Sequence, residues 1–454
     1  MPHSPTKLAQ HWQANRVIYI TLMGMMATGF PFTILTVALK PIAEEFSVTE
    51  ALATWTVSAP MLISAVCFPL MGKVGDTYGH RRVFLIGISL STVFAGCCFF
   101  AWDIWSLIVF RVLSMLFAGA TTPSGMAILF HQYDGDERGR AVGWWAMGGP
   151  GSAALGLIAG GPMVDIWGWR SVFMFQILCG AVAWIIALTS LPETHKRPAA
   201  FDHIGNLILI IALLCLLFAI SSVSDQDIAA LTKWGVALFG VIGLLVFLKY
   251  EGYAADPIVP AGLLTTRNFA NPSMASFMLQ AAYLGALVVT PITLIDIFGY
   301  SISVAAGLML LRTASLTIAT PFGGRLATAL SERIAATIGI SLQAIGIAIM
   351  AAGVYWLRIE LLLVGLVIQG VGHGLAFPPL TAIIATAVEP GLFGTASGLN
   401  RLISQIGSSL GLSLFGALLA IPPESLNLPM IFLIGSGLTL IGLIPAGLIK
   451  RPNG

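Results

Sequence analysis

The stretch GKVGDTYGHRR, Gly72 to Arg82, places an aspartate, a lysine, a histidine and two arginines in a chain in which charged residues make up only 9%. Long apolar runs flank it on both sides. The chain has 454 residues, of which 57% are hydrophobic, and its mean hydropathy is +0.91. Soluble domains average about 45–50% apolar and about 25% charged residues. The sequence therefore indicates an all-α integral membrane protein, and this stretch is one of its loops.

The spacing of charges predicts fourteen transmembrane helices, because a helix needs about 20 apolar residues to cross a bilayer. Three apolar runs contain one arginine each, one contains only His373, and 234–248 is short and spans if its flanking lysines reach the headgroups. The predicted spans are 17–39, 51–72, 83–102, 104–130, 141–164, 171–192, 204–224, 234–248, 268–295, 297–324, 334–357, 361–388, 390–423 and 425–449.

The basic residues predict the orientation, because cytoplasmic loops retain Lys and Arg. With the N-terminus inside, only Lys40, Arg170, Lys233 and Arg358 of the 22 basic residues fall in loops outside, and three more fall within spans. We therefore expect both termini to be cytoplasmic, in a plasma membrane or an inner membrane. This asymmetry also accounts for the net charge of +2, so the charge gives no reason to expect a nucleic acid partner.

The positions of the cysteines and the lengths of the loops argue against a disulfide framework and against a separate soluble domain. All five cysteines fall within apolar spans, where they act as small hydrophobic residues, so no disulfide framework is expected. The longest loops are too short to fold alone. We find no metal-binding cluster and no cofactor motif, and we expect a monomer in the lipid bilayer that binds a small molecule.

The stretch Gly72 to Arg82 combines a tight turn with a charge. Three glycines allow close backbone approach, and Asp76 precedes the next helix, where a carboxylate meets the positive end of the helix dipole and pairs with an arginine. A plain basic loop would explain the arginines but not this spacing. The pattern resembles the signature loop of the major facilitator superfamily, Gly-x-Leu-a-Asp-r-x-Gly-r-k. The resemblance implies an inner-gate role for Gly72, Gly75, Asp76, Gly79, Arg81 and Arg82.

An internal repeat is consistent with that resemblance. The stretch GGRLATALSER, from Gly323 to Arg333, keeps the Gly-x-Leu-Ala start but has Thr328 where the aspartate would stand. Members of this superfamily consist of two six-helix halves, so we predict halves at 1–191 and 267–454, with an inserted helix pair within 192–266. Fourteen helices with this insertion resemble the drug/proton antiporter branch.

The span 141–164 carries small residues four positions apart, which give it a flat face that another helix can approach closely. The antiporter signature Gly-x-x-x-Gly-Pro-x-x-Gly-Gly is similar to Ser152 to Gly161, with serine for the first glycine and leucine for the proline. Ordinary small-residue packing is the alternative. The packing residues are Gly148, Ser152, Gly156, Gly160 and Gly161.

Charged groups inside spans are the candidates for a substrate cavity and for ion coupling, since such residues are costly in lipid and usually functional. They are Arg111, Arg312 and His373, with Asp296 at a span end. Pairing with carbonyl groups or with Asp296 is the structural alternative. The first span lacks the aspartate that the antiporter branch commonly places there, so His373 is the candidate group for coupled protons.

These features predict a secondary active transporter that moves small organic molecules by alternating access, as proton-coupled efflux, and not an enzyme. The first alternative is an uptake transporter of the same superfamily for an organic solute, and an anionic solute is one option. The distant alternative is a membrane-bound acyltransferase, because His131 and Asp136 have the spacing of such an active site. A solvated charged turn explains that pair better.

Overall fold

The structure, a computed structural model, describes residues 7–30, 35, 38–48, 50–194, 203–221, 230–252, 262–300, 302–419 and 427–449. Every regular element in these residues is a helix. Lipid offers no partner to backbone N–H and C=O groups, so apolar runs of this length satisfy them within a helix. The first part of the chain, which we call the N-half, contains α1 (Lys7–Gly29), α3 (Leu39–Glu45), α4 (Glu50–Tyr78), α5 (His80–Phe99), α6 (Ile104–Ala118), α7 (Thr121–Gln132), α8 (Gly135–Ala146), α9 (Gly148–Trp167) and α10 (Ser171–Ser190).

Two helices follow, α11 (His203–Ser221) and α12 (Ala230–Glu251), and then the part that we call the C-half. It includes a π-helical turn, η2 (Thr293–Ile297), and three short 3₁₀ segments, η1 (Leu263–Thr265), η3 (Ile383–Ala387) and η4 (Pro390–Leu392). Its α-helices are α13 (Arg267–Ile292), α14 (Ile302–Ala329), α15 (Glu332–Tyr355), α16 (Ile359–Ala382), α17 (Phe393–Leu419), α18 (Leu428–Ile441) and α19 (Leu443–Gly447).

Within the described residues, eight helical stretches are long and apolar enough to cross a membrane, and some of them, such as Ile104–Gln132, join two consecutive elements. α4 makes nine if its two segments count as one span. α4 contains Pro60 and Pro69 and bends by 45° between its segments. α11 and α12 contribute shorter apolar stretches, Ile204–Leu216 and Leu231–Phe247. The chain is therefore a helical multi-pass membrane protein, and the count of fourteen spans remains a prediction.

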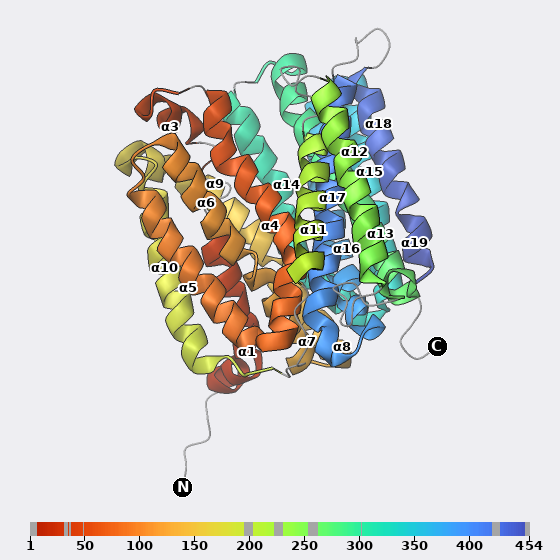
Figure 1. Cartoon of the computed structure of the whole chain (residues 1–454). Coiled ribbons are helices and arrows are strands. Elements are labelled where there is room, and N and C mark those ends of the chain that lie inside the picture. The colour runs from red at the N-terminus through yellow and green to blue at the C-terminus, as the bar shows by residue number, and fades with distance from the viewer. Residues whose placement is uncertain are drawn as a thin grey trace.

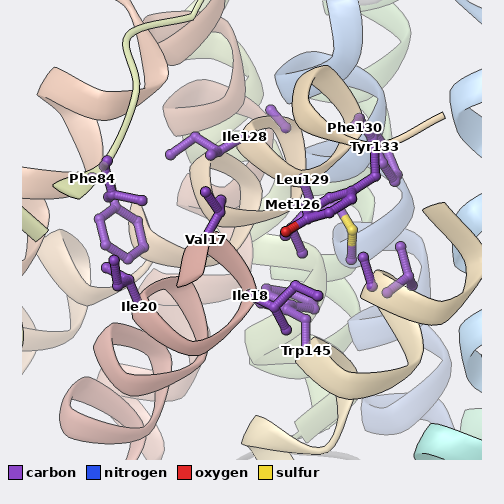
Figure 2. Close-up of a cluster of buried hydrophobic side chains, with 14 of the residues drawn as sticks. Val17, Ile18, Ile20, Phe84, Met126, Ile128, Leu129, Phe130, Tyr133 and Trp145 are labelled. Atoms are coloured by element: carbon purple, nitrogen blue, oxygen red, sulfur yellow. The ribbon is translucent and has the colours of Figure 1, made fainter. Parts of the chain in front are cut away.

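The two halves contact each other at one end of the bundle. α4 ends and α5 begins there, at the bottom of Figure 1, and we call it the Asp76 end. A hydrophobic cluster near this end combines Val17, Met126 and Trp145 of the N-half (Figure 2) with Ala382 and Phe393 of the C-half. The buried apolar side chains at the Asp76 end thus belong to both halves.

The opposite end, which carries α3 at the top of Figure 1, is organised differently. We call it the Glu45 end, because Glu45 forms an ion pair with Arg170 there. One cluster at this end draws only on the N-half, including Ile42 and Phe173. A second cluster draws only on the C-half, including Val289 and Phe432. Within the described residues, the hydrophobic clusters at the Glu45 end are separate for each half.

The α11–α12 pair lies against both halves (Figure 1). Leu209 and Leu213 of α11 and Phe247 of α12 share a buried cluster with Val66 of α4 and Leu402 of α17. The pair therefore packs on α4 and α17, which contact each other across the boundary between the halves. The predicted boundaries at 191 and 267 remain predictions.

Candidate functional site

The Asp76 carboxylate joins the two halves. Its Oδ1 accepts a hydrogen bond from the Gly394 amide at 2.9 Å, and its Oδ2 accepts bonds from the Thr395 amide at 2.7 Å and the Thr395 hydroxyl at 2.6 Å. Gly394 and Thr395 belong to the first turn of α17, where amide groups lack partners within the helix and the helix dipole is positive. Asp76 of the N-half therefore caps a helix of the C-half with a buried negative charge.

His80 is the second partner of Asp76. Its Nε2 lies 2.9 Å from Asp76 Oδ1, and the ring is fully buried. An ionised carboxylate can only accept hydrogen bonds, so Nε2 carries the hydrogen. The His80 backbone amide donates to Thr194 Oγ1 at 3.0 Å, which fixes the start of α5. The carboxylate, the ring and the first turn of α17 thus form one buried polar unit.

Close backbone contact between α4 and α17 depends on glycine. A Cβ added to Gly72 would lie 2.1 Å from the Gly394 carbonyl oxygen, and a Cβ on Gly394 would lie 2.5 Å from the Gly72 oxygen. One turn further along, a Cβ on Gly398 would lie 2.4 Å from the Phe68 oxygen. Neither helix can carry a side chain at these positions without moving, so the two backbones touch.

Two details of the sequence prediction are wrong. We expected a glycine turn over the whole stretch, but α4 continues to Tyr78, and only Gly79, with φ of 98°, forms the turn. Gly75 instead makes room for the His80 ring, which a Cβ would approach to 2.2 Å. We also expected Asp76 to meet the start of the next helix and an arginine. It meets α17 and His80, because its place in the last turn of α4 directs it to the other half.

The two arginines of the stretch lie apart from the carboxylate. Arg81 Nη2 donates to the Leu188 carbonyl at 2.6 Å, and Arg82 is exposed. Both line a shallow depression beside Trp184 and Glu193, between α5 and α10. The structure thus brings Gly72, Gly75 and Asp76 into the contact between the halves and places Gly79 at the turn. Arg81 and Arg82 lie beside α10, away from that contact.

Arg138 also bridges the halves, and the sequence suggested only an orientation signal for it. Its guanidinium lies over the rings of Phe130 at 5.7 Å and Phe393 at 5.5 Å. It also donates to Asp134 Oδ1 at 2.7 Å. Burial lowers the pKa of Arg138 below its usual value, and the charge of Asp134 opposes that change. The residues that donate to Asp76, Gly394 and Thr395, were missed as well, although the small-residue run GTASG marks a face for close helix contact.

We call the close contact between α4 and α17 the first crossing. A second crossing joins α8 of the N-half to α14 of the C-half. A Cβ on Gly324 would lie 2.2 Å from the Gly139 oxygen, and a Cβ on Gly143 would lie 3.1 Å from the Gly324 Cα. Thr328, which replaces the aspartate in the repeat, donates its hydroxyl hydrogen to the Arg325 carbonyl of its own helix. This crossing has the close backbone contact of the first one, and the described residues show no carboxylate bond from α14 to α8 in it.

The predicted flat face of α9 packs on α1 at its N-terminal end. A Cβ on Gly148 would lie 2.7 Å from Leu22 Cδ1, and a Cβ on Gly29 would lie 3.2 Å from Ser152 Oγ. Gly156 is buried. Gly160 and Gly161 are helical residues of α9, but their surroundings lie outside what the structure describes.

The candidate cavity residues separate into two groups. Arg312 and His373 both lie against Tyr283 in the C-half, with the Arg312 Cζ 4.3 Å and the His373 ring 4.2 Å from the Tyr283 ring centroid. Arg111 is buried in the N-half, where its Nε donates to the Thr56 carbonyl at 3.4 Å. Asp296 is exposed in η2, and the described residues contain no ion pair between it and Arg312.

His131 lies at the contact between the halves. Its ring centroid is 5.0 Å from that of Phe393 and 6.2 Å from that of His80. It lies in the last turn of α7, and the side chain of Asp136 lies outside the described residues. His131 is therefore packed among aromatic groups beside the Asp76 unit.

Comparisons with known proteins show which family of proteins the chain resembles. The sequence profile described as Major Facilitator Superfamily matches residues 21–248 and 272–454. The multidrug resistance protein Stp of Mycobacterium tuberculosis is 29% identical over 418 residues, which cover 89% of this chain and 76% of Stp. The drug efflux pump JefA of the same species is 28% identical, with coverage of 89% and 80%. The tetracenomycin C resistance and export protein of Streptomyces glaucescens is 25% identical, with coverage of 88% and 74%.

Solved structures share the fold. The human organic anion transporter MFSD10 superposes with a TM-score of 0.72 at 16% identity, covering 95% of this chain and 99% of that structure. The proton:xylose symporter XylE superposes with a TM-score of 0.67 at 11% identity, covering 96% and 95%.

Proposed function

The chain belongs to the Major Facilitator Superfamily and is a membrane transporter, and we propose that it exports small organic molecules by proton-coupled alternating access. The names of its relatives Stp, JefA and the tetracenomycin C exporter support export of drug-like molecules. Because members of this family are transporters and not enzymes, His131 is better explained by its packing against Phe393 than by acyl transfer.

The observation that carries the proposal is the bond between the Asp76 carboxylate and the first turn of α17. It links the two halves at one end, while the clusters at the Glu45 end stay within single halves. Alternating access needs an element with two arrangements, and a bond that forms only when one end is closed is such an element. We propose that this structure represents the state closed at the Asp76 end.

The orientation and span count are part of the proposal. The excess of Lys and Arg in loops at the Asp76 end supports a cytoplasmic location for that end and for both termini, in the plasma or inner membrane. We propose fourteen spans in a monomer, with halves at 1–191 and 267–454 and the inserted pair α11–α12 between them. That pair packs against α4 and α17, so it lies beside the proposed gate.

Protons are the proposed coupling ion. The chain has no acid in α1 to carry them. The candidate groups are His373, inside α16, and the Asp76–His80 unit, where a proton added to the carboxylate would remove an acceptor from the α17 amides.

Transport in cells tests the proposal. The chain is expressed in bacteria that lack their main efflux pumps, and ethidium accumulation and susceptibility to a panel of amphipathic toxicants are measured with and without a protonophore. We expect lower accumulation than with the empty vector, and we expect the protonophore to abolish the difference. Equal accumulation with and without the chain, for every compound, would refute export. A difference that survives the protonophore would refute proton coupling alone.

A further inference from the structure

A buried polar cluster occupies the interior of the C-half. The Tyr283 ring of α13 contacts both the Arg312 guanidinium of α14 and the His373 ring of α16. His373 Nδ1 lies 2.9 Å from Gln343 Oε1, and Gln343 Nε2 donates to the Leu279 carbonyl at 2.9 Å. Four helices therefore contribute to one cluster, and α15 supports it from behind through Gln343.

The cluster carries positive charge without an acid. Arg312 is 2% exposed, its Nη1 makes one long bond of 3.4 Å to the Tyr283 carbonyl, and its Nε has no partner. Within the described residues no aspartate or glutamate forms an ion pair with it. Burying an ion that lacks a counter-ion is costly, and the ring of Tyr283 compensates only in part. The site lacks a negative charge.

Gln369 adds unsatisfied groups to the same helix face. It precedes His373 by four residues on α16, so the two side chains are neighbours on one side of the helix. It is fully buried, and neither its Oε1 nor its Nε2 has a partner. Buried amides are nearly always hydrogen-bonded, so this one calls for a partner that the chain does not supply.

The cluster reaches the boundary between the halves. α14, which carries Arg312, contacts α9 of the N-half, and α13, which carries Tyr283, contacts α17. Arg401, on α17, packs over the ring of Phe68 on α4 at 5.7 Å, and α4 belongs to the N-half. Arg312 lies about 15 Å along α14 from Ile302, at ~1.5 Å per residue, which is near the middle of the membrane. Transporters bind substrates at that depth, at the interface of their repeats.

We propose that Arg312, Tyr283, His373 and Gln369 form a binding subsite for the anionic group, a carboxylate or sulfonate, of an aromatic substrate. This inference rests on the proposed transport of small molecules and names their chemical class. A guanidinium binds a carboxylate through two parallel N–H groups, and Arg312 Nε is free to serve as one of them. The Gln369 amide supplies a further donor, and the Tyr283 and His373 rings supply apolar faces.

Matched probes test the subsite. Binding of 2-naphthoate, neutral 2-naphthamide and cationic 2-naphthylmethylammonium to the purified full-length protein in nanodiscs is measured by calorimetry. We expect wild type to bind the carboxylate at least about tenfold more tightly than the other two probes, because the gain of one charged hydrogen bond raises affinity by about that factor. Equal affinity for the three probes would overturn the proposal.

Variants assign that preference to the cluster. Arg312→Met should remove the preference for naphthoate while naphthamide binding remains, and Arg312→Lys should keep part of it. Gln369→Leu, which has a similar shape, should lower naphthoate affinity about threefold, as expected for one neutral hydrogen bond. The exposed arginine variant Arg358→Met is the matched control and should bind as wild type. If Arg312→Met does not fold, Arg312→Lys and Gln369→Leu decide. An undiminished preference in those variants would contradict the assignment.

Transport separates this inference from the proposed function. Uptake of the three probes into proteoliposomes under a proton gradient is measured for wild type. A preference for naphthoate in binding, with no transport of any compound, would contradict export and leave the subsite intact. Transport of the amide and the cation at the same rate as naphthoate would contradict the subsite and leave export intact.

Discussion

The two crossings between the halves differ in one chemical respect. α4 meets α17 and α8 meets α14, and in each pair a glycine of one helix lies against the backbone of the other, as Gly72 does on Gly394 and Gly324 does on Gly139. Within the described residues, a carboxylate bonds to the helix of the other half only at the first crossing. Asp76 binds the α17 amides there, whereas Thr328 bonds to its own helix. Close packing is thus common to both crossings, and the charge is particular to one.

The difference follows from where each crossing lies relative to the first turn of the partner helix. Gly394 and Thr395 are the second and third residues of α17, and their amides are free to bind a carboxylate. Gly139 lies beyond the first four residues of α8, so its amide takes part in the helical hydrogen bonds. An acid at position 328 would face Gly139, whose amide already has a partner within α8. The comparison indicates that the acid binds where the amides of the partner helix's first turn lie directly at the crossing.

The largest expected effect is that of Asp76→Asn. Asparagine keeps one acceptor oxygen but places an NH2 group against the donors of α17, and each charged hydrogen bond lost costs about 1.5–3 kcal/mol. Export of the best substrate should fall by more than about tenfold, since about 1.4 kcal/mol changes an equilibrium tenfold. The measurement is the initial rate in cells with matched expression.

The control is Asp134→Asn, which removes an exposed acid that is paired with Arg138 at the same end of the bundle. We expect it to retain most of the export activity, because exposed ion pairs contribute about 0–1 kcal/mol. Equal rates for wild type and Asp76→Asn would show that the contact with α17 does not control transport.

Backbone contact should matter at both crossings. In Gly72→Ala and Gly324→Ala the new Cβ would lie 2.1 Å and 2.2 Å from a backbone oxygen. Overpacking costs about 1–3 kcal/mol, so both variants should lower the export rate about three- to tenfold. Gly307→Ala is the matched control on α14, because no atom lies within 4 Å of its added Cβ. A loss in Gly72→Ala alone would show that the α8–α14 contact is incidental.

A smaller effect is expected for His80→Ala. Asp76 would lose one partner but keep its three bonds to α17, so the closed state should weaken by about 1.5–3 kcal/mol at most. The export rate should fall less than in Asp76→Asn when both are measured in one assay. Arg82→Ala, which alters an exposed neighbour, serves as control. A defect in His80→Ala that exceeds that of Asp76→Asn would mean that the ring acts apart from the carboxylate.

The smallest effect is expected for Thr328→Asp, which restores the acid in the repeat. Surface changes of this kind usually stay within about 0.5 kcal/mol, so the export rate should stay within about twofold of wild type. Because the Gly139 amide that faces position 328 is already bonded within α8, Asp76→Asn with Thr328→Asp should be as defective as Asp76→Asn alone. Recovery of transport in the double variant would contradict our explanation of the two crossings.

Much of this architecture is readable from the sequence. The apolar runs predict the helices, and the spacing of Gly72, Gly75 and Asp76, with its repeat at Gly323, marks the segments that meet between the halves. The partner of Asp76 was not predictable, because the start of α17 at Phe393 depends on the preceding 3₁₀ turn and not on an apolar boundary. Helical Gly72 and Gly75 were also missed, since glycine favours turns unless another backbone must come close.

Interspin distances across the Asp76 end test the central claim most directly. Spin labels at Tyr78 and Glu389, both exposed, are measured by double electron–electron resonance in a variant that lacks the native cysteines and still transports. We predict one short distance for the parent without substrate, and a second, longer population in Asp76→Asn but not in Asp134→Asn. An identical distance distribution in the parent and in Asp76→Asn would contradict the claim that the carboxylate holds this end closed.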